Sequence, residues 1–158
     1  DDAVDVERKL VAACGDRFVE RSQSLGAVRH FRIAVDGNAD RFAFHAASNT
    51  LFINFERLVI RSQADIDAVQ REVEHLLQPI GARVYGVVNY EHFSLPPELE
   101  DAWGDMVQRL VARHYLSVTR YSTSGFLRSK LGSALAARGV APHVYESAEE
   151  ARAHLREV

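Results

Sequence analysis

Arg83-Val-Tyr-Gly-Val-Val-Asn-Tyr-Glu-His-Phe93 is the stretch of the sequence that decides the fold. Residues 84–88 form a short apolar run with β-branched side chains and no alternation with polar residues. Such a run is typical of a strand with both faces covered, as in a parallel sheet with helices above and below it. Strongly helical patterns flank the run on both sides. The sequence therefore predicts a central strand in a layered α/β domain.

Polar and aromatic residues follow this strand directly, at Asn89, Tyr90, Glu91 and His92. Ligands in open α/β sheets bind beyond the carboxyl ends of the strands, so these four residues are a candidate polar site. A carboxylate beside an imidazole can transfer protons if both groups face one cavity. Successive residues of an extended segment point to opposite sides, however. The favoured interpretation is a loop whose polar groups satisfy backbone ends, with a ligand site as the alternative.

A second candidate site lies between a predicted strand and a predicted helix, at residues 120–125. Free N–H groups at a helix start suit an anion such as phosphate or a carboxylate, and Gly125 lets it approach the backbone. Arg120 adds a positive charge if it points the same way, and Tyr121 follows it. The alternative is that Ser122 or Ser124 caps the helix, which alone explains the hydroxyl groups. Both interpretations stay open at this stage.

The composition is that of an ordinary globular domain. The chain has 158 residues, of which 26% are charged and 47% are hydrophobic, enough for one domain with a sizeable core. A net charge of −3 argues against a dedicated nucleic-acid binder, which needs a basic excess or a basic face. The seven histidines show no metal-ligand spacing, so we expect no metal, and nothing indicates a cofactor.

The start of the sequence and its cysteine content predict a cytoplasmic protein. Asp1 and Asp2 stand where a signal peptide has basic residues, and no apolar run reaches the length of a membrane span. Cys14 is the one cysteine, which excludes an internal disulfide and suits a reducing compartment. Because the sequence does not begin with Met, we expect a processed chain or a fragment of a longer protein.

The organisation along the chain predicts one α/β domain over residues 1–158. An amphipathic helix is expected near residues 4–21 within an N-terminal part, 1–26, and an antiparallel hairpin in residues 27–56. Residues 57–158 alternate helix and strand, which implies a mostly parallel sheet with flanking helices. Two capping boxes, at 62–65 and 147–150, mark helix starts, and residues 140–145 are expected to form the last strand.

Four segments carry a resemblance to a known family, and they cover roughly the last two-thirds of the chain. Residues 49–56, 83–93, 113–132 and 139–147 resemble the C-terminal extension of bacterial acyl-CoA:acetate/3-ketoacid CoA-transferases. In that family the extension follows a catalytic region, where a glutamate in Gly-rich surroundings forms the enzyme-bound CoA thioester. No counterpart of those surroundings occurs here. The resemblance implies a non-catalytic domain that has the transferase catalytic region as its partner, on the same or another chain, and a role in assembly or substrate closure.

A weaker resemblance is to the STAS domains of anti-sigma-factor antagonists. Residues 144–151 are similar to the closing strand and helix cap of that group, and Ser124-Gly125 is similar to its phospho-acceptor at a helix start. This resemblance implies a STAS-like α/β fold and a regulatory module that binds a protein partner or a small anion. A CoA ester is a further candidate ligand under the first resemblance. A third hypothesis is a small independent enzyme that uses residues 89–92.

Overall fold

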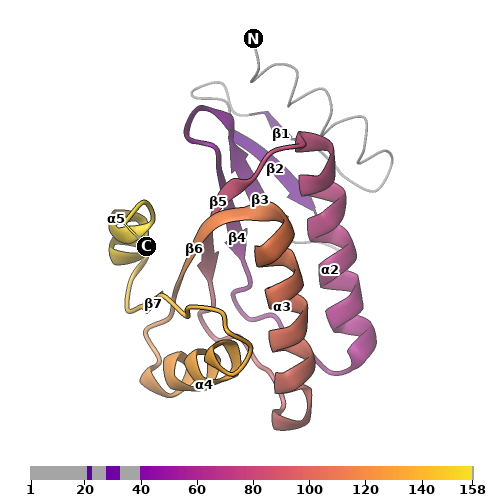
Figure 1. Ribbon diagram of the computed structural model, residues 1–158, viewed down its shortest axis with the longest axis vertical. Coiled ribbons are helices and arrows are strands. Elements are labelled where there is room, and N and C mark those ends of the chain that lie inside the picture. The colour runs from indigo at the N-terminus through magenta and orange to yellow at the C-terminus, as the bar shows by residue number, and fades with distance from the viewer. Residues whose placement is uncertain (1–20, 23–27, 33–39, 158) are drawn as a thin grey trace.

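The computed structural model describes residues 21–22, 28–32 and 40–157. Within these residues one seven-stranded sheet carries its strands in the order of the sequence, as Figure 1 shows. The strands from the first edge to the other are β1 (Arg21–Ser22), β2 (Val28–Arg32), β3 (Asp40–His45), β4 (Thr50–Asn54), β5 (Val84–Asn89), β6 (Tyr115–Tyr121) and β7 (Val144–Tyr145).

Antiparallel and parallel pairing divide the sheet at β4. Strands β1 to β4 pair antiparallel, and β4 to β7 pair in parallel. This arrangement confirms the α/β class and the N-terminal antiparallel hairpin, which lies at one edge of the sheet. The central strand predicted within residues 83–93 is also confirmed, because β5 lies between two parallel neighbours. The predicted helix over residues 4–21 falls almost entirely outside the described residues, and Arg21 itself lies in β1.

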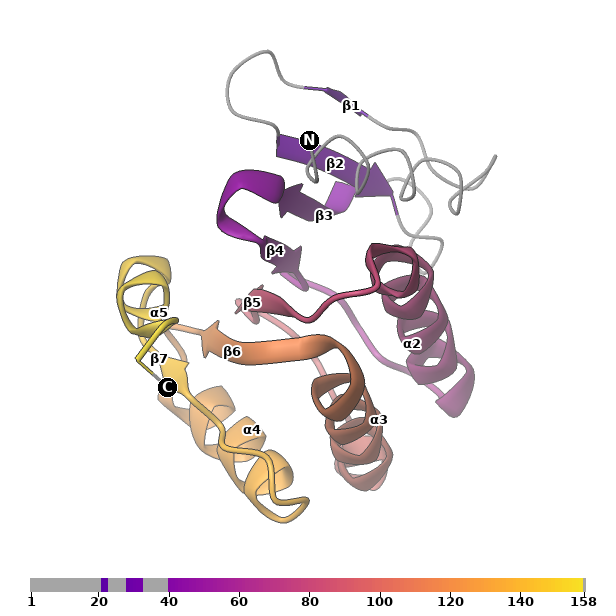
Figure 2. The same ribbon diagram turned by 45° about the horizontal axis from the view of Figure 1, so that its top comes forward.

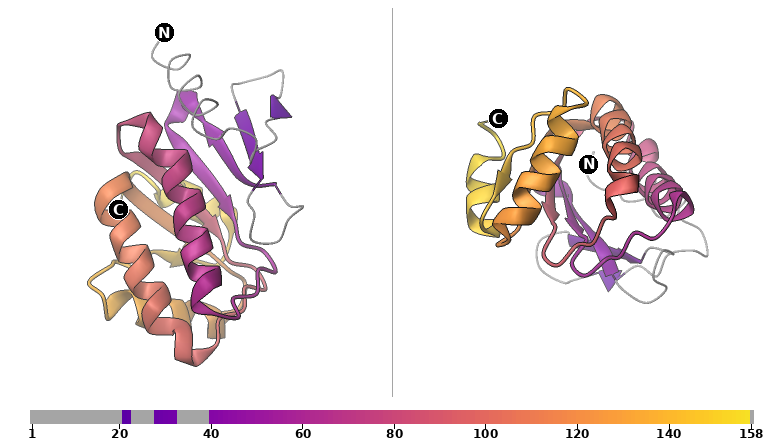
Figure 3. Two further views of the ribbon diagram at one scale, coloured as in Figure 1. Left: turned by 90° about the vertical axis from the view of Figure 1, so that its right-hand side faces the viewer. Right: turned by 90° about the horizontal axis from the view of Figure 1, so that it is seen from below.

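The connections between the parallel strands decide which face each helix covers. Helices α2 (Gln63–Leu77), α3 (Glu100–His114) and α4 (Gly125–Ala136) each join a strand to its next neighbour in the sheet. Right-handed crossovers that advance in one direction leave their helices on one face. Figure 2 shows these three helices on one side of the sheet and α5 (Ala148–His154) on the other. Figure 3 shows α2 and α3 running side by side, in agreement with their contacts.

The two covered faces hold cores of different size. The larger core lies under α2, α3 and α4 and includes a cluster of aromatic rings, with Phe55 and Tyr90 at 5.7 Å between ring centroids and Phe93 and Trp103 at 5.0 Å. The smaller core lies under α5 and contains Val87, Ala151 and Leu155. Two arginines of the α5 segment also lie over aromatic rings of the sheet: Arg152 over Phe52 at 5.2 Å and Arg156 over Tyr85 at 4.3 Å.

The two predicted helix starts are confirmed, but in both the acidic side chain binds a different backbone N–H from the one in a standard capping box. Ser147 Oγ accepts a hydrogen bond from the Glu150 backbone N–H at 3.2 Å, and Glu150 reaches back to the N–H of Glu146 at 3.1 Å. Asp65 likewise reaches back to the N–H of Arg61 at 2.8 Å. Ser62 makes no side-chain cap, so the first box is only half formed. In both boxes the acid binds the residue before the cap, not the cap itself.

The last strand is shorter than the sequence predicts. Only Val144–Tyr145 pairs with β6, whereas a strand was expected over residues 140–145. Pro142 has no N–H to donate to a neighbouring strand. The carbonyl oxygens of Ala141 and Pro142 accept hydrogen bonds from the side chain of Arg120 at 3.5 and 2.8 Å. Residues 141 and 142 are therefore bound to the sheet by the side chain of Arg120. Backbone pairing begins at His143, whose carbonyl oxygen accepts a hydrogen bond from the backbone N–H of Arg120.

Candidate functional site

The three central parallel strands end at the same level of the sheet. Asn54 of β4 pairs with Asn89 of β5, and Asn89 pairs with Tyr121 of β6. The two candidate sites, residues 89–92 and 120–125, therefore lie next to each other, and Tyr90 N–H also donates to the Tyr121 carbonyl at 3.0 Å. This edge is where an α/β sheet leaves room for a ligand.

The ends of β4 and β5 repeat one local structure that the sequence analysis missed. Asn54-Phe55-Glu56 and Asn89-Tyr90-Glu91 share the pattern of an amide, an aromatic residue and a glutamate. In each, the asparagine Oδ1 accepts the backbone N–H of the glutamate, at 3.0 and 2.8 Å. This Asx turn bends the chain away from the strand and directs the aromatic ring into the larger core. The repeated triplet was the signal in the sequence.

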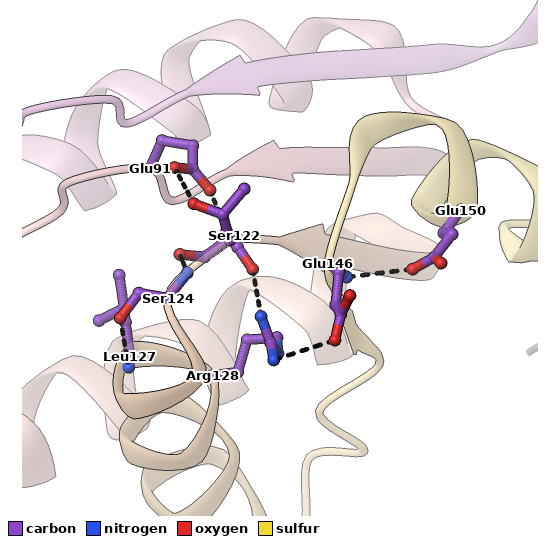
Figure 4. A network of polar contacts seen from close by, with 8 residues as sticks. Glu91, Ser122, Ser124, Leu127, Arg128, Glu146 and Glu150 are labelled. Carbon is purple, nitrogen blue, oxygen red and sulfur yellow. Dashed lines mark hydrogen bonds and ion pairs between the residues drawn. The ribbon is translucent and has the colours of Figure 1, made fainter.

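Glu91 joins the end of β5 to the turn that follows β6. Its two carboxylate oxygens accept hydrogen bonds from the backbone N–H and the hydroxyl group of Thr123, the second at 2.8 Å, as Figure 4 shows. Partial burial raises the pKa of Glu91, but the hydrogen bonds from Thr123 and the nearby His92 outweigh burial and hold that pKa below its ordinary value. Glu91 is therefore the anion that the turn binds in this structure.

The remaining polar groups of the turn also serve to begin α4. Ser124 Oγ accepts the N–H of Leu127 at 3.2 Å, and Ser122 Oγ accepts the N–H of Ser124 at 3.2 Å. Arg128 donates to the Ser122 carbonyl at 2.8 Å and lies 3.3 Å from a carboxylate oxygen of Glu146 (Figure 4). Helix capping, one of the two open interpretations, is thus confirmed for these hydroxyl groups.

Arg120 does not supply charge to this turn. Its side chain is 2% exposed and points to the face of α3 and α4, where it holds the carbonyls of Ala141 and Pro142. Tyr90 and Tyr115 lie on the same face, and burial raises the pKa of each phenol although the charge of Arg120 opposes that rise. The expectation that Arg120 and the turn form one anion site is therefore not met, because alternate residues of β6 face opposite sides.

A small cavity adjoins Arg120 in the larger core. Its volume is about 30 Å³, room for one or two water molecules, and its polar lining comes from Tyr90, Trp103, Tyr115 and Arg120. Within the described residues, Arg120 Nε and Trp103 Nε1 have no hydrogen-bond partner. Buried donors are normally paired, so ordered water is the simplest occupant.

The other predicted site residues take separate places. Asn89 and Tyr121 point to the face of α5 and are half-buried, and burial raises the pKa of Tyr121. His92 is exposed with a φ of 54°, and Gly125 is the first residue of α4. The predicted residues thus share one edge of the sheet but divide among a turn, the core and the opposite face.

Comparisons with protein families, with curated proteins and with solved structures return no match for this chain. In the described part of the chain, no group of three or more histidine, cysteine or acidic side chains is placed to hold a metal ion. Among the helices of that part, none has the length and apolar character needed to cross a membrane.

Proposed function

We propose that this chain is a non-catalytic C-terminal domain of a CoA-transferase of the acyl-CoA:acetate/3-ketoacid type, with a role in assembly or in closing the substrate site. The resemblance of residues 49–56, 83–93, 113–132 and 139–147 supports the transferase context. The observation that carries the non-catalytic role is the pair of hydrogen bonds from Thr123 to Glu91.

Those bonds make Glu91 a poor candidate for chemistry. A carboxylate that forms a thioester or accepts a proton becomes a weaker nucleophile and a weaker base when its oxygens accept hydrogen bonds and its pKa falls. Both oxygens of Glu91 are bound, and their bonding lowers its pKa. At this edge, hydrogen bonds within turns and caps also go to the Oδ1 atom of Asn89 and the hydroxyl oxygens of Ser122 and Ser124. We infer that the polar groups at this edge stabilise the local backbone conformation.

The turn after β6 and the start of α4 present an exposed aromatic side chain. Phe126, in the first turn of α4, is 79% exposed, and Thr123, Ser124 and Gly125 beside it are exposed as well. We name these four residues the α4 face. Aromatic side chains are frequent anchors of protein interfaces, and a surface fixed before binding loses little entropy on association. The α4 face is the surface that we propose contacts the transferase catalytic region.

Binding between the purified chain and the catalytic region tests this function. The region to use is a separately expressed acyl-CoA:acetate CoA-transferase catalytic region, and the measurement is the dissociation constant from sedimentation velocity. We expect Phe126→Asp to weaken binding at least tenfold, roughly the loss for an interface anchor. Leu116→Asp is the matched control, because Leu116 is 54% exposed on β6, outside the α4 face. Equal losses in both variants, or no complex at all, would contradict the proposal.

A regulatory module of the STAS type is the second candidate. The exposed Ser124 beside Phe126, together with the likeness of residues 144–151, favours it. Under this alternative the α4 face binds a regulatory protein, or a small anion displaces Glu91 from Thr123. Titration with phosphate, acetate and CoA separates the cases: shifts of the Thr123, Ser124 and Gly125 amides would favour the module that binds a small anion. If these amides stay unmoved while the catalytic region binds, the transferase role is favoured.

A further inference from the structure

A groove lies on the face of the sheet that α5 covers only in part. Its volume is about 350 Å³, within the range of small-ligand pockets, and it is lined by the last residues of three parallel strands, Asn54, Asn89 and Tyr121. Strand ends of this kind are where α/β sheets bind ligands. The groove is separate from the turn at Glu91, because that turn is tied to α4 on the opposite face.

The two asparagines offer paired donors to this groove. Because each Oδ1 accepts a backbone N–H, each Nδ2 amino group is directed elsewhere, and neither has a hydrogen-bond partner within the described residues. The two residues are direct neighbours on parallel strands, so their backbones lie about 4.8 Å apart. Two amide donors at that spacing can each bind one oxygen of a single carboxylate.

Charge and apolar surface complete the site. The guanidinium of Arg152 lies over the Phe52 ring, which also lines the groove together with Val87. Arg41 lines it from the next strand and donates to the carbonyls of Asn54 and Glu56. The apolar surface suits a short hydrocarbon group, while Arg152 can pair with an acidic one. Burial raises the pKa of Tyr121, and the negative charges of Glu56 and Glu91 both help to raise it, so two carboxylates lie near the groove and disfavour ligands with two negative charges.

We propose that this groove binds a small organic monocarboxylate, with its carboxylate held by Asn54, Asn89 and Arg152 and its apolar part against Phe52 and Val87. The site stands on its own residues and does not depend on the proposed transferase role. Binding of a short-chain acid in this groove involves no covalent step.

The test is an NMR titration of the purified chain with acetate, butyrate and benzoate at constant ionic strength. The side-chain NH₂ signals of Asn54 and Asn89 and the amide signal of Tyr121 should shift together. Affinity should rise from acetate to butyrate by roughly fourfold for each added methylene that is buried. Inorganic phosphate should bind more weakly than butyrate.

Two variants with the same charge change make the result specific. Asn54→Asp keeps an oxygen for the Glu56 N–H but replaces the donor with a negative charge, so butyrate binding should weaken at least about tenfold. Asn49→Asp is the control, because Asn49 lies just before β4, at the end of the strand opposite Asn54. The Asn49→Asp variant should bind butyrate as tightly as the parent chain does. The proposal is overturned if butyrate leaves the groove signals unmoved, or if Asn54→Asp binds as tightly as Asn49→Asp.

Discussion

Glu91 shows at the scale of one residue how a long-range hydrogen bond uses a carboxylate. Proton transfer with His92 was the alternative, and the favoured interpretation was a loop whose polar groups satisfy backbone ends. Glu91 accepts the backbone N–H of Thr123, a residue 32 positions away. No periodicity or spacing rule connects Glu91 to Thr123, so the sequence gives no sign of the bond. Ser124 is different: a helix cap is a local pattern, and that alternative could be named in advance.

Glu91→Gln should make the chain less stable at neutral pH by about 1 kcal/mol, because one side-chain oxygen and the charge that Thr123 binds are lost. The folded pKa of Glu91 lies below its ordinary value of 4.5. Its contribution is therefore fully present above pH 4.5 and is lost as the pH falls through the lowered folded pKa. Urea unfolding at a series of pH values should show the difference between the two chains shrinking in acid. Glu98→Gln, at an exposed residue, is the control and should change nothing. A difference that stays constant with pH would refute the assigned role of the carboxylate.

Strand β5 shows at the scale of an element what the apolar run does and does not reveal. The run predicted a central, covered strand, and Val84, Val87 and Val88 are buried. The apolar run could not show that the two faces of β5 pack against cores of different size. Val88 faces the large core, and Val87 faces the small core under α5. The short length of β7 also depends on a contact between distant parts of the sequence. The side chain of Arg120 donates hydrogen bonds to the carbonyl oxygens of Ala141 and Pro142, and local sequence patterns do not predict such a contact.

Val88→Asp and Val87→Asp should therefore have unequal effects. Val88→Asp buries an unpaired carboxylate in the large core and should abolish cooperative folding. Val87→Asp places the same charge under α5, where it lines the groove together with Arg152, so the chain should remain folded with lower stability. Far-ultraviolet circular dichroism during thermal unfolding measures both. A more damaging change at Val87 than at Val88 would mean that the small core matters more than its size suggests.

In the described part of the chain, α2, α3 and α4 pack on one face of the sheet and α5 packs on the other face. The helical stripes were legible in the sequence because the stripes of α2, α3 and α4 pack on the same core. The groove is lined by the ends of three strands from separate parts of the sequence, so it depends on which strand ends align. That alignment became visible only with the register of β4, β5 and β6.

The central claim is that the polar groups at the ends of β5 and β6 have a structural role and perform no CoA transfer. An assay of the purified chain itself tests this claim most directly. Acetyl-CoA and a labelled carboxylate are the substrates, and mass spectrometry of the intact protein reports any covalent CoA adduct. We predict no turnover above the rate without protein and no adduct, because both oxygens of Glu91 are bound by Thr123. Turnover by the parent chain that disappears in Glu91→Gln would contradict the account and identify residues 89–92 as an active site.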